Sequence, residues 1–137
     1  MAPLDDTARS LLDGRNVAHL ATLMPDGAPK AEPVWVGREG DHVLIATDER
    51  TIKARNVAGD PRVALSIVDA ANPYLQLLIR GRVVEVRPDD DLAALDALSE
   101  KYLGRPFPRR RWTSRVVLVV APSLARTYRS ALADLVE

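Results

Sequence analysis

Three strand-like segments follow one another near the start of the chain, and their succession restricts the fold more than any other feature. They span residues 16–23, 29–36 and 42–47, and two short stretches rich in Gly, Pro and Asp, at 25–27 and 37–41, separate them. Proline fixes φ and glycine permits positive φ, so both stretches have the composition of tight turns. Because strands joined by short turns pair antiparallel, these residues predict a sheet of consecutive hairpins.

The rest of the chain continues the β pattern. Further strands are expected over residues 62–68, 74–87 and 116–121, and residues 124–128 are expected to extend the sheet after Pro122. Gly81 lies inside the longest of these segments, where an interior glycine indicates a bulge or a barrel corner. The sheet should therefore bend at that point.

Helices are expected over residues 5–14, 48–58 and 92–103, followed by a tail at 130–137. Asp48 is expected to begin the second helix and Gly59 to end it, while Gly104 ends the third. Roughly six strands with helices only at the crossings predict a mainly β fold, a small antiparallel barrel that is closed or nearly closed. Neither repeats nor linkers interrupt this pattern, so one domain spanning residues 1–137 is expected.

Charge and cysteine content exclude several classes of function. Nineteen basic side chains balance nineteen acidic ones among the 137 residues, so bulk attraction to nucleic acid or to an anionic membrane is not indicated. The chain has no cysteine, which excludes disulfides, thiolate metal sites and thiol catalysis. No apolar run is long enough to span a membrane, and we expect a cytoplasmic protein. Sixteen of the basic residues are arginine, which suggests a GC-rich genome such as that of an actinobacterium.

Familiar catalytic and metal-binding patterns are missing. The two histidines, His19 and His42, lie in predicted strands without acidic residues at ligand spacing, so no metal site is expected. There is no nucleophile elbow, phosphate loop or dinucleotide glycine motif. The aspartates at 89–91 suit a helix start rather than catalysis. We therefore expect no catalytic side-chain nucleophile.

The segment from Thr51 to Asn56 has the composition of an anion site. A hydroxyl, two cations and an amide (Thr51, Lys53, Arg55 and Asn56) follow the start of a predicted helix, whose free N–H groups already favour an anion. The alternative is a solvated helix face on which Glu49 pairs with Lys53.

A second basic segment contains Arg105, Arg109, Arg110, Arg111 and Arg115, with Phe107 and Trp112 between them. It is interpreted either as a solvated loop or as a loop closing over an anionic cofactor or substrate. Binding of single-stranded nucleic acid is the weaker alternative, because the net charge is zero.

The order of these motifs resembles the pyridoxamine 5′-phosphate oxidase-like split β-barrel family. The resemblance rests on residues 19–29, on Pro33-Val34-Trp35-Val36, on residues 51–56 followed by 60–65, and on residues 80–83. It covers residues 11–128 and is strongest to the branch that uses the deazaflavin coenzyme F420, with FMN as the alternative cofactor. The resemblance implies a six-stranded split barrel of the FMN-binding type.

The family also implies a homodimer with cofactor sites at the subunit interface. Thr51, Lys53, Arg55 and Asn56 match the phosphate motif, and Pro33, Val34 and Trp35 match the strand along the cofactor ring. Thr47 would lie near the ribityl chain. Tyr74 and Gln76 would come from the partner subunit, with Tyr74 as a candidate proton donor, and Arg115 would reach the cofactor tail or the substrate.

The function implied is an F420-dependent oxidoreductase that transfers a hydride to a small, planar, electron-poor acceptor. Two alternatives stay open. One is an FMN-dependent oxidoreductase or flavin reductase of the same fold. The other is a non-catalytic protein that binds F420, FMN, haem or another tetrapyrrole.

Overall fold

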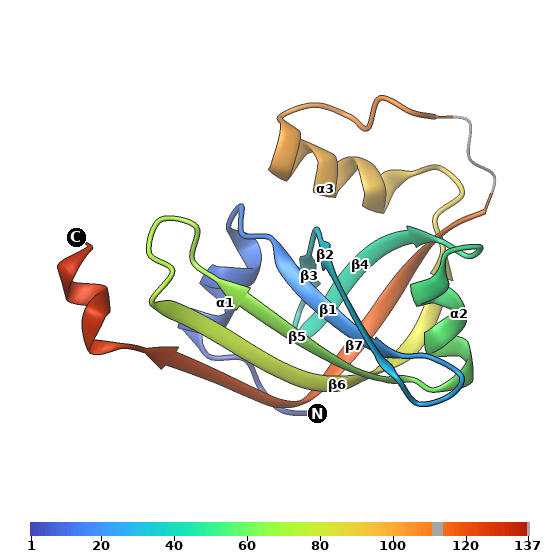
Figure 1. Cartoon of the computed structure of the whole chain (residues 1–137). Coiled ribbons are helices and arrows are strands. Elements are labelled where there is room, and N and C mark those ends of the chain that lie inside the picture. The colour runs from blue at the N-terminus through green and yellow to red at the C-terminus, as the bar shows by residue number, and fades with distance from the viewer. Residues whose placement is uncertain (111–113, 137) are drawn as a thin grey trace.

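The computed structural model describes residues 1–110 and 114–136 and contains one antiparallel sheet of seven strands (Figure 1). The strand order is β2-β1-β5-β6-β7-β4-β3, so β2 and β3 form the two edges of a barrel that is not closed. The strands are β1 (Ala18–Leu23), β2 (Pro29–Val34), β3 (Gly37–Glu39), β4 (His42–Asp48), β5 (Arg62–Val68), β6 (Leu75–Pro88) and β7 (Arg115–Arg129). The mainly β, split-barrel class expected from the sequence is confirmed.

The strand count differs from the six expected. The additional strand is β3, which pairs with β4 through Gly37–Leu44, Arg38–Val43 and Glu39–His42. These three residues were expected to form only a turn, and their Gly and charged composition carries no strand signal. Pairing with β4 makes them a strand despite that composition. In the hairpin β1–β2, by contrast, Gly27 adopts the positive φ of 87° expected of the turn.

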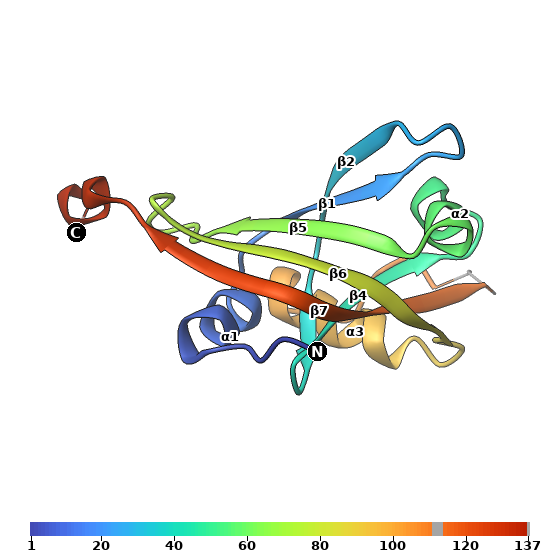
Figure 2. The same ribbon diagram turned by 90° about the horizontal axis from the view of Figure 1, so that it is seen from below.

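The longest ladder joins β6 to β7 and runs from Leu75–Arg129 to Pro88–Val116. Its register shifts between Arg80 and Gly81 and again between Val83 and Glu85, which confirms a bulge at Gly81. Pro122 does not end β7, which continues to Arg129. In Figure 2 the end of β7 and the short 3-10 helix after it (Ala131–Leu135) extend beyond the rest of the chain.

Three α-helices accompany the sheet: α1 (Asp6–Asp13), α2 (Ile52–Gly59) and α3 (Ala93–Leu103). The start of α2 corrects an expectation, because the N-cap is Thr51 rather than Asp48. The carboxylate of Asp48 instead accepts hydrogen bonds from Arg50 and from the Ser114 hydroxyl, so it is engaged away from the helix start.

Asp89 and Asp91 cap the start of α3 as expected, although neither is the N-cap residue itself. Its N-cap is Leu92, in the left-handed conformation at φ 61°, and makes no side-chain cap bond. Asp89 accepts from the backbone N–H groups of Ala94 and Leu95 instead, both at 3.0 Å. Gly104 ends the helix as expected, with a positive φ of 75°.

The core lies inside the curled sheet and beneath α1. Fully buried aliphatic side chains from β1, β4, β5, β6 and β7 meet there, including Leu20, Ile45, Leu65, Ile79 and Leu118. Alternate residues of each strand point inward, which leaves the other face of the sheet for contacts outside this core. Among the described residues, none of the helices is long and apolar enough to cross a bilayer.

Gly81→Ala should destabilise the fold, because a Cβ at position 81 would lie 2.4 Å from the backbone oxygen of Ala121. Forcing a methyl group against a backbone costs about 1–3 kcal/mol. We expect a corresponding fall in the free energy of unfolding measured in urea. Gly59→Ala is the matched control, since nothing lies within 4 Å of its added Cβ. Equal stability of the two variants would contradict the close-approach argument.

Candidate functional site

A hollow of about 430 Å³ opens between α3, the end of β2 and the strands β4 and β7. Its volume lies in the range of small-molecule sites, roughly 300–1,000 Å³. Most of its wall is apolar and comprises Val17, Pro33, Val34, Trp35, Ala46, Leu95, Leu98 and Phe107. Two cations, Lys53 and Arg115, complete the lining. The hollow therefore combines an apolar, partly aromatic wall with a basic end.

Trp35 is the centre of the aromatic wall. Its ring stacks on that of Tyr102, with centroids 5.2 Å apart and planes 6° apart. The ring of Phe107 meets Trp35 edge-on, with centroids 6.1 Å apart. Phe107 follows α3, and its backbone N–H donates to Asp96 of that helix. These contacts bring the helix, the loop after it and the strand end together around one ring.

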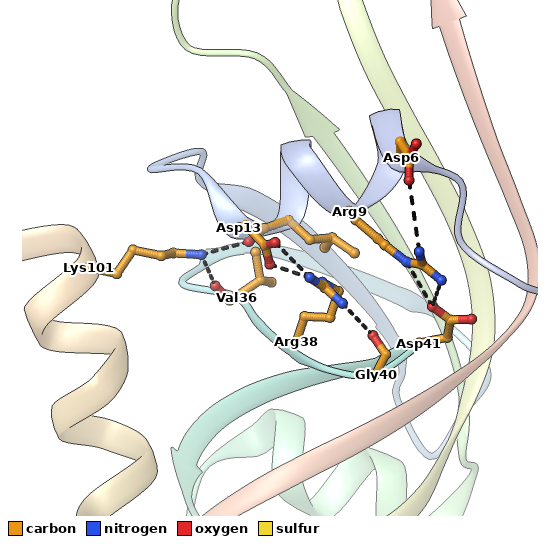
Figure 3. A network of polar contacts seen from close by, with 9 residues as sticks. Asp6, Arg9, Asp13, Val36, Arg38, Gly40, Asp41 and Lys101 are labelled. Carbon is orange, nitrogen blue, oxygen red and sulfur yellow. Dashed lines mark hydrogen bonds and ion pairs between the residues drawn. The ribbon is translucent and has the colours of Figure 1, made fainter.

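Two consecutive residues of α3 fix the helix to the main chain beneath it. The Tyr102 hydroxyl accepts from the Val36 N–H at 3.2 Å and donates to the Asn16 carbonyl at 2.7 Å. The Lys101 ammonium donates to the carbonyls of Leu12, at 2.7 Å, and Val36 (Figure 3). Burial lowers the pKa of Lys101 to about 8 and raises that of Tyr102.

At the basic end, Lys53 points toward β2 rather than along its own helix. Its Nζ lies 3.5 Å from Oε2 of Glu32, and Oε1 of the same carboxylate lies 3.1 Å from Nζ of Lys30. The side chain of Lys53 is only 15% exposed. The structure thus pairs Lys53 with Glu32 rather than with Glu49, and Glu32 is a site residue that sequence reasoning missed.

Arg115 connects the hollow to an adjoining one that Asp48, Arg50 and Thr51 also line. Burial lowers the pKa of Arg115, while Asp48 and Asp89 act in the opposite direction. The guanidinium of Arg50 holds the pKa of Asp48 well below its usual range, so this carboxyl is ionised. Cations therefore outnumber carboxylates around this second hollow.

Thr51 and Thr47 support the start of α2. The Thr51 hydroxyl donates to the Asp48 carbonyl at 2.8 Å and lies 3.0 Å from the hydroxyl of buried Thr47. It also accepts from the Ala54 N–H at 3.4 Å, as an N-cap does. Thr47 therefore lies directly behind Thr51 rather than in the lining of the hollow under α3.

The other two residues of the helix motif point elsewhere. Asn56 is buried, and its amide donates to the Thr22 hydroxyl at 3.0 Å and to the Met24 sulfur at 3.3 Å. It ties α2 to the first hairpin. Arg55 is exposed.

Tyr74 and Gln76 lie at the far end of the sheet within the same chain. Gln76 pairs with Val68 of β5, six residues beyond Arg62, the residue at which β5 begins after α2. At about 3.3 Å per residue, that is a separation of roughly 20 Å along the strand. Both side chains are exposed. One chain does not bring them to the hollow.

The basic segment after α3 is partly structured by pairing. Arg110 forms two hydrogen bonds with Asp96, at 2.8 and 3.0 Å, and Arg105 and Arg109 are exposed. Arg111 and Trp112 lie outside the described residues. The sequence could indicate Phe107 through its place in this basic loop, whereas Glu32, Lys101 and Tyr102 carried no local signal.

Comparison with known proteins identifies close likenesses. The family described as Pyridoxamine 5′-phosphate oxidase matches residues 4–129. A structure named F420 reductase is 32% identical, with a TM-score of 0.82 over 90% of this chain and 98% of that chain. A heme binding protein from Mycobacterium smegmatis is 25% identical, with a TM-score of 0.69 over 96% of this chain and 57% of that chain. A conserved hypothetical protein from Mycobacterium tuberculosis, 19% identical, shares the fold with a TM-score of 0.76 over 94% and 86% of the two chains.

Tyr102→Phe should destabilise the protein, because the Val36 N–H and the Asn16 carbonyl both lose their partner. Leaving such buried groups unsatisfied costs about 1–3 kcal/mol. We expect that loss in urea unfolding followed by tryptophan fluorescence. Tyr128→Phe removes a hydroxyl from a side chain that is 61% exposed and serves as the control. If both variants unfold at the wild-type midpoint, Tyr102 does not anchor α3.

Proposed function

Since this chain belongs to the pyridoxamine 5′-phosphate oxidase family, we propose that it is an oxidoreductase that uses coenzyme F420 to reduce a small, planar, electron-poor acceptor. The observation that carries this proposal is the hollow under α3, which joins an aromatic, apolar wall to the cations Lys53 and Arg115. The likeness to the F420 reductase structure supports the deazaflavin as the cofactor.

The basic end suits a phosphate. Lys53 and Arg115 line the hollow from α2 and β7, and both can donate charge-assisted hydrogen bonds to one anion. Glu32 pairs with the Lys53 ammonium at the wall of the hollow. The start of α2, capped by Thr51, adds the positive end of a helix dipole to the same side. Arg55 and Asn56 are not assigned to this contact, because one is exposed and the other is bonded to Thr22.

The apolar wall suits a flat ring. Pro33, Val34 and Trp35 lie at the end of β2, which is an edge strand, so its outer backbone groups are not used in the sheet. These groups can hydrogen-bond the polar rim of a heteroaromatic ring. Leu95, Leu98 and Phe107 line the same space from α3 and the loop after it, and add apolar surface for such a ring.

A bound reduced deazaflavin supplies the hydride, so the protein needs no nucleophile of its own. The residues of this chain would bind the cofactor and orient it. Lys53 and Arg115 would hold the anionic tail, and the Pro33–Trp35 segment would contact the ring. An acceptor held in close contact with the ring would gain the orientation part of the rate enhancement. Tyr74 is assigned as a candidate proton donor only in a dimer, given its distance from the hollow within one chain.

We infer that two chains form the working unit. The outer face of the sheet carries apolar side chains that the chain itself leaves uncovered, namely Val68, Tyr74, Leu78 and Tyr128. The register places Val68, Gln76 and Tyr128 in one row and Ser66, Leu78 and Arg126 in the next. A second copy seated on this face would cover them and bring its own Tyr74 and Gln76 toward the hollow.

FMN and haem are the competing ligands. FMN shares the tricyclic ring and the phosphate, so the same residues would bind it. A haem role is favoured by the likeness to a heme binding protein, but neither His19 nor His42 lines the hollow. Titrating the protein with F420, reduced F420, FMN and haem, followed by fluorescence or absorbance, separates these cases. Preferred binding of FMN or haem would overturn the proposal. F420 binding without reduction of any enone or quinone would reduce the role to cofactor binding.

Lys53→Ala should lower the affinity for F420 by about 10- to 100-fold, because a charge-assisted hydrogen bond contributes about 1.5–3 kcal/mol. Fluorescence titration of the cofactor measures this loss. Lys30→Ala is the control, since Lys30 shares the Glu32 partner but does not line the hollow. An affinity loss equal in both variants would assign the effect to Glu32 or to general charge rather than to contact by Lys53.

Leu78→Glu should convert the dimer to a monomer, because it places a charge on a 40% exposed apolar residue in the centre of the outer face. Sedimentation velocity over a range of protein concentrations measures the association state. Leu103→Glu, at an exposed position on α3, is the control. A wild-type protein that sediments as a monomer, or a Leu78→Glu variant that remains dimeric, would contradict this interface.

A further inference from the structure

The hollow under α3 does not end the space beneath that helix. Another hollow of about 220 Å³, called the far hollow below, adjoins it between α3 and the same two strands, β4 and β7. Ala46 of β4 lines the hollow under α3. Leu44, the preceding residue on the same face of β4, lines the far hollow. In β7, Arg115 and Val117 stand in the same relation. The two hollows therefore lie next to each other along β4 and β7.

Leu98 lies between them, since it lines both hollows and is 7% exposed. Its Cδ2 atom lies 3.0 Å from the position that a Cβ on Gly37 would occupy. Any side chain at position 37 would thus push against Leu98, whereas glycine leaves room for this leucine.

The far hollow has apolar sides and a charged end. Leu44, Ala94, Ala97 and Val117 form the sides, and Asp13, Arg38 and Lys101 form the end. Asp13 is held by Arg38 at 3.0 and 2.7 Å, so its charge is already neutralised (Figure 3).

Lys101 supplies the remaining positive charge at that end. The Leu12 and Val36 carbonyls accept two of the three N–H groups of its ammonium. The end of the far hollow therefore carries one net positive charge and one further donor. Asp13 from α1, Arg38 from β3 and the Tyr102 ring beside Lys101 are the other groups facing it. Burial penalises this ammonium, and a bound carboxylate would relieve that penalty.

We propose that the acceptor is an elongated, amphipathic molecule: its flat head lies beside Trp35, and its short aliphatic chain passes Leu98 and ends in a carboxylate at Lys101. This inference rests on the proposed function for the identity of the head. The far hollow fits the chain and its carboxylate whatever reaction takes place at Trp35. From Leu95 to Lys101 the helix rises about 9 Å, which limits the chain to a short one.

Direct binding tests the far hollow without any cofactor. Isothermal titration with butyrate, hexanoate, octanoate and the neutral octanol gives the affinity of the tail alone. We expect octanoate to bind more tightly than octanol, and Lys101→Met to weaken octanoate binding by about tenfold while sparing octanol. Lys30→Met is the matched control, because Lys30 lies in neither hollow. Octanoate binding that is indifferent to Lys101→Met overturns the proposal.

A second variant guards against a loss of fold in Lys101→Met. Ala94→Leu fills the far hollow with a side chain that favours helix, and thermal unfolding checks that the variant is folded. It should abolish octanoate binding and leave F420 binding unchanged. Retained octanoate binding in this variant would place the ligand elsewhere and overturn the proposal.

The catalytic arm uses a pair of enones that differ only at the chain end. With reduced F420, the enone carrying a terminal carboxylate should have a KM about tenfold lower than its methyl ester, with similar kcat, and Lys101→Met should remove the difference. Octanoate binding at Lys101 without F420 binding would refute the proposed function and keep the far site. F420-dependent turnover with no preference for the carboxylate would support the proposed function and overturn the far site.

Discussion

The pairing of β6 with β7 is the constraint on which the rest of the architecture depends. They are the two longest strands of the sheet. On its other side β6 pairs with β5, which leads to β1 and β2, and β7 pairs with β4, which leads to β3. At the first of the two register shifts in this ladder, Gly81 lets the backbone of Ala121 come close. Helix α3 is the connection between these two strands, so the roof of the candidate site is placed by the same pairing.

Local chemistry predicted the elements well where the responsible contacts are near in sequence. The turn at Gly27, the bulge at Gly81 and the end of α3 at Gly104 each follow from one residue and its neighbours. The start of α2 did not, because the Asp48 carboxylate accepts from Ser114, which precedes the neighbouring strand β7 and is distant in sequence. β3 was not predictable either, since its strand state comes from pairing with β4 rather than from its own side chains.

The same division holds for the site. Lys53 could be singled out from its own segment, and Pro33 to Trp35 from the family resemblance, and the fold brings them into one hollow with Arg115. Glu32, Lys101 and Tyr102 could not, because each contacts a residue that is distant in sequence. A formal net charge of zero also concealed the local arrangement, in which a neutralised lysine and a partly buried arginine face an apolar wall.

The two backbone groups of Val36 restrict how substitutions can change the shape of the site. Its N–H is bonded to Tyr102 and its carbonyl to Lys101, adjacent residues of one helix. The helix and the strand end that it covers are thereby clamped as one body. The gap between floor and roof then has a fixed height, set by the main chain and independent of what lines it. Descendants of this chain can alter what they admit by exchanging Leu98 or Phe107, but a thicker molecule requires breaking the clamp itself.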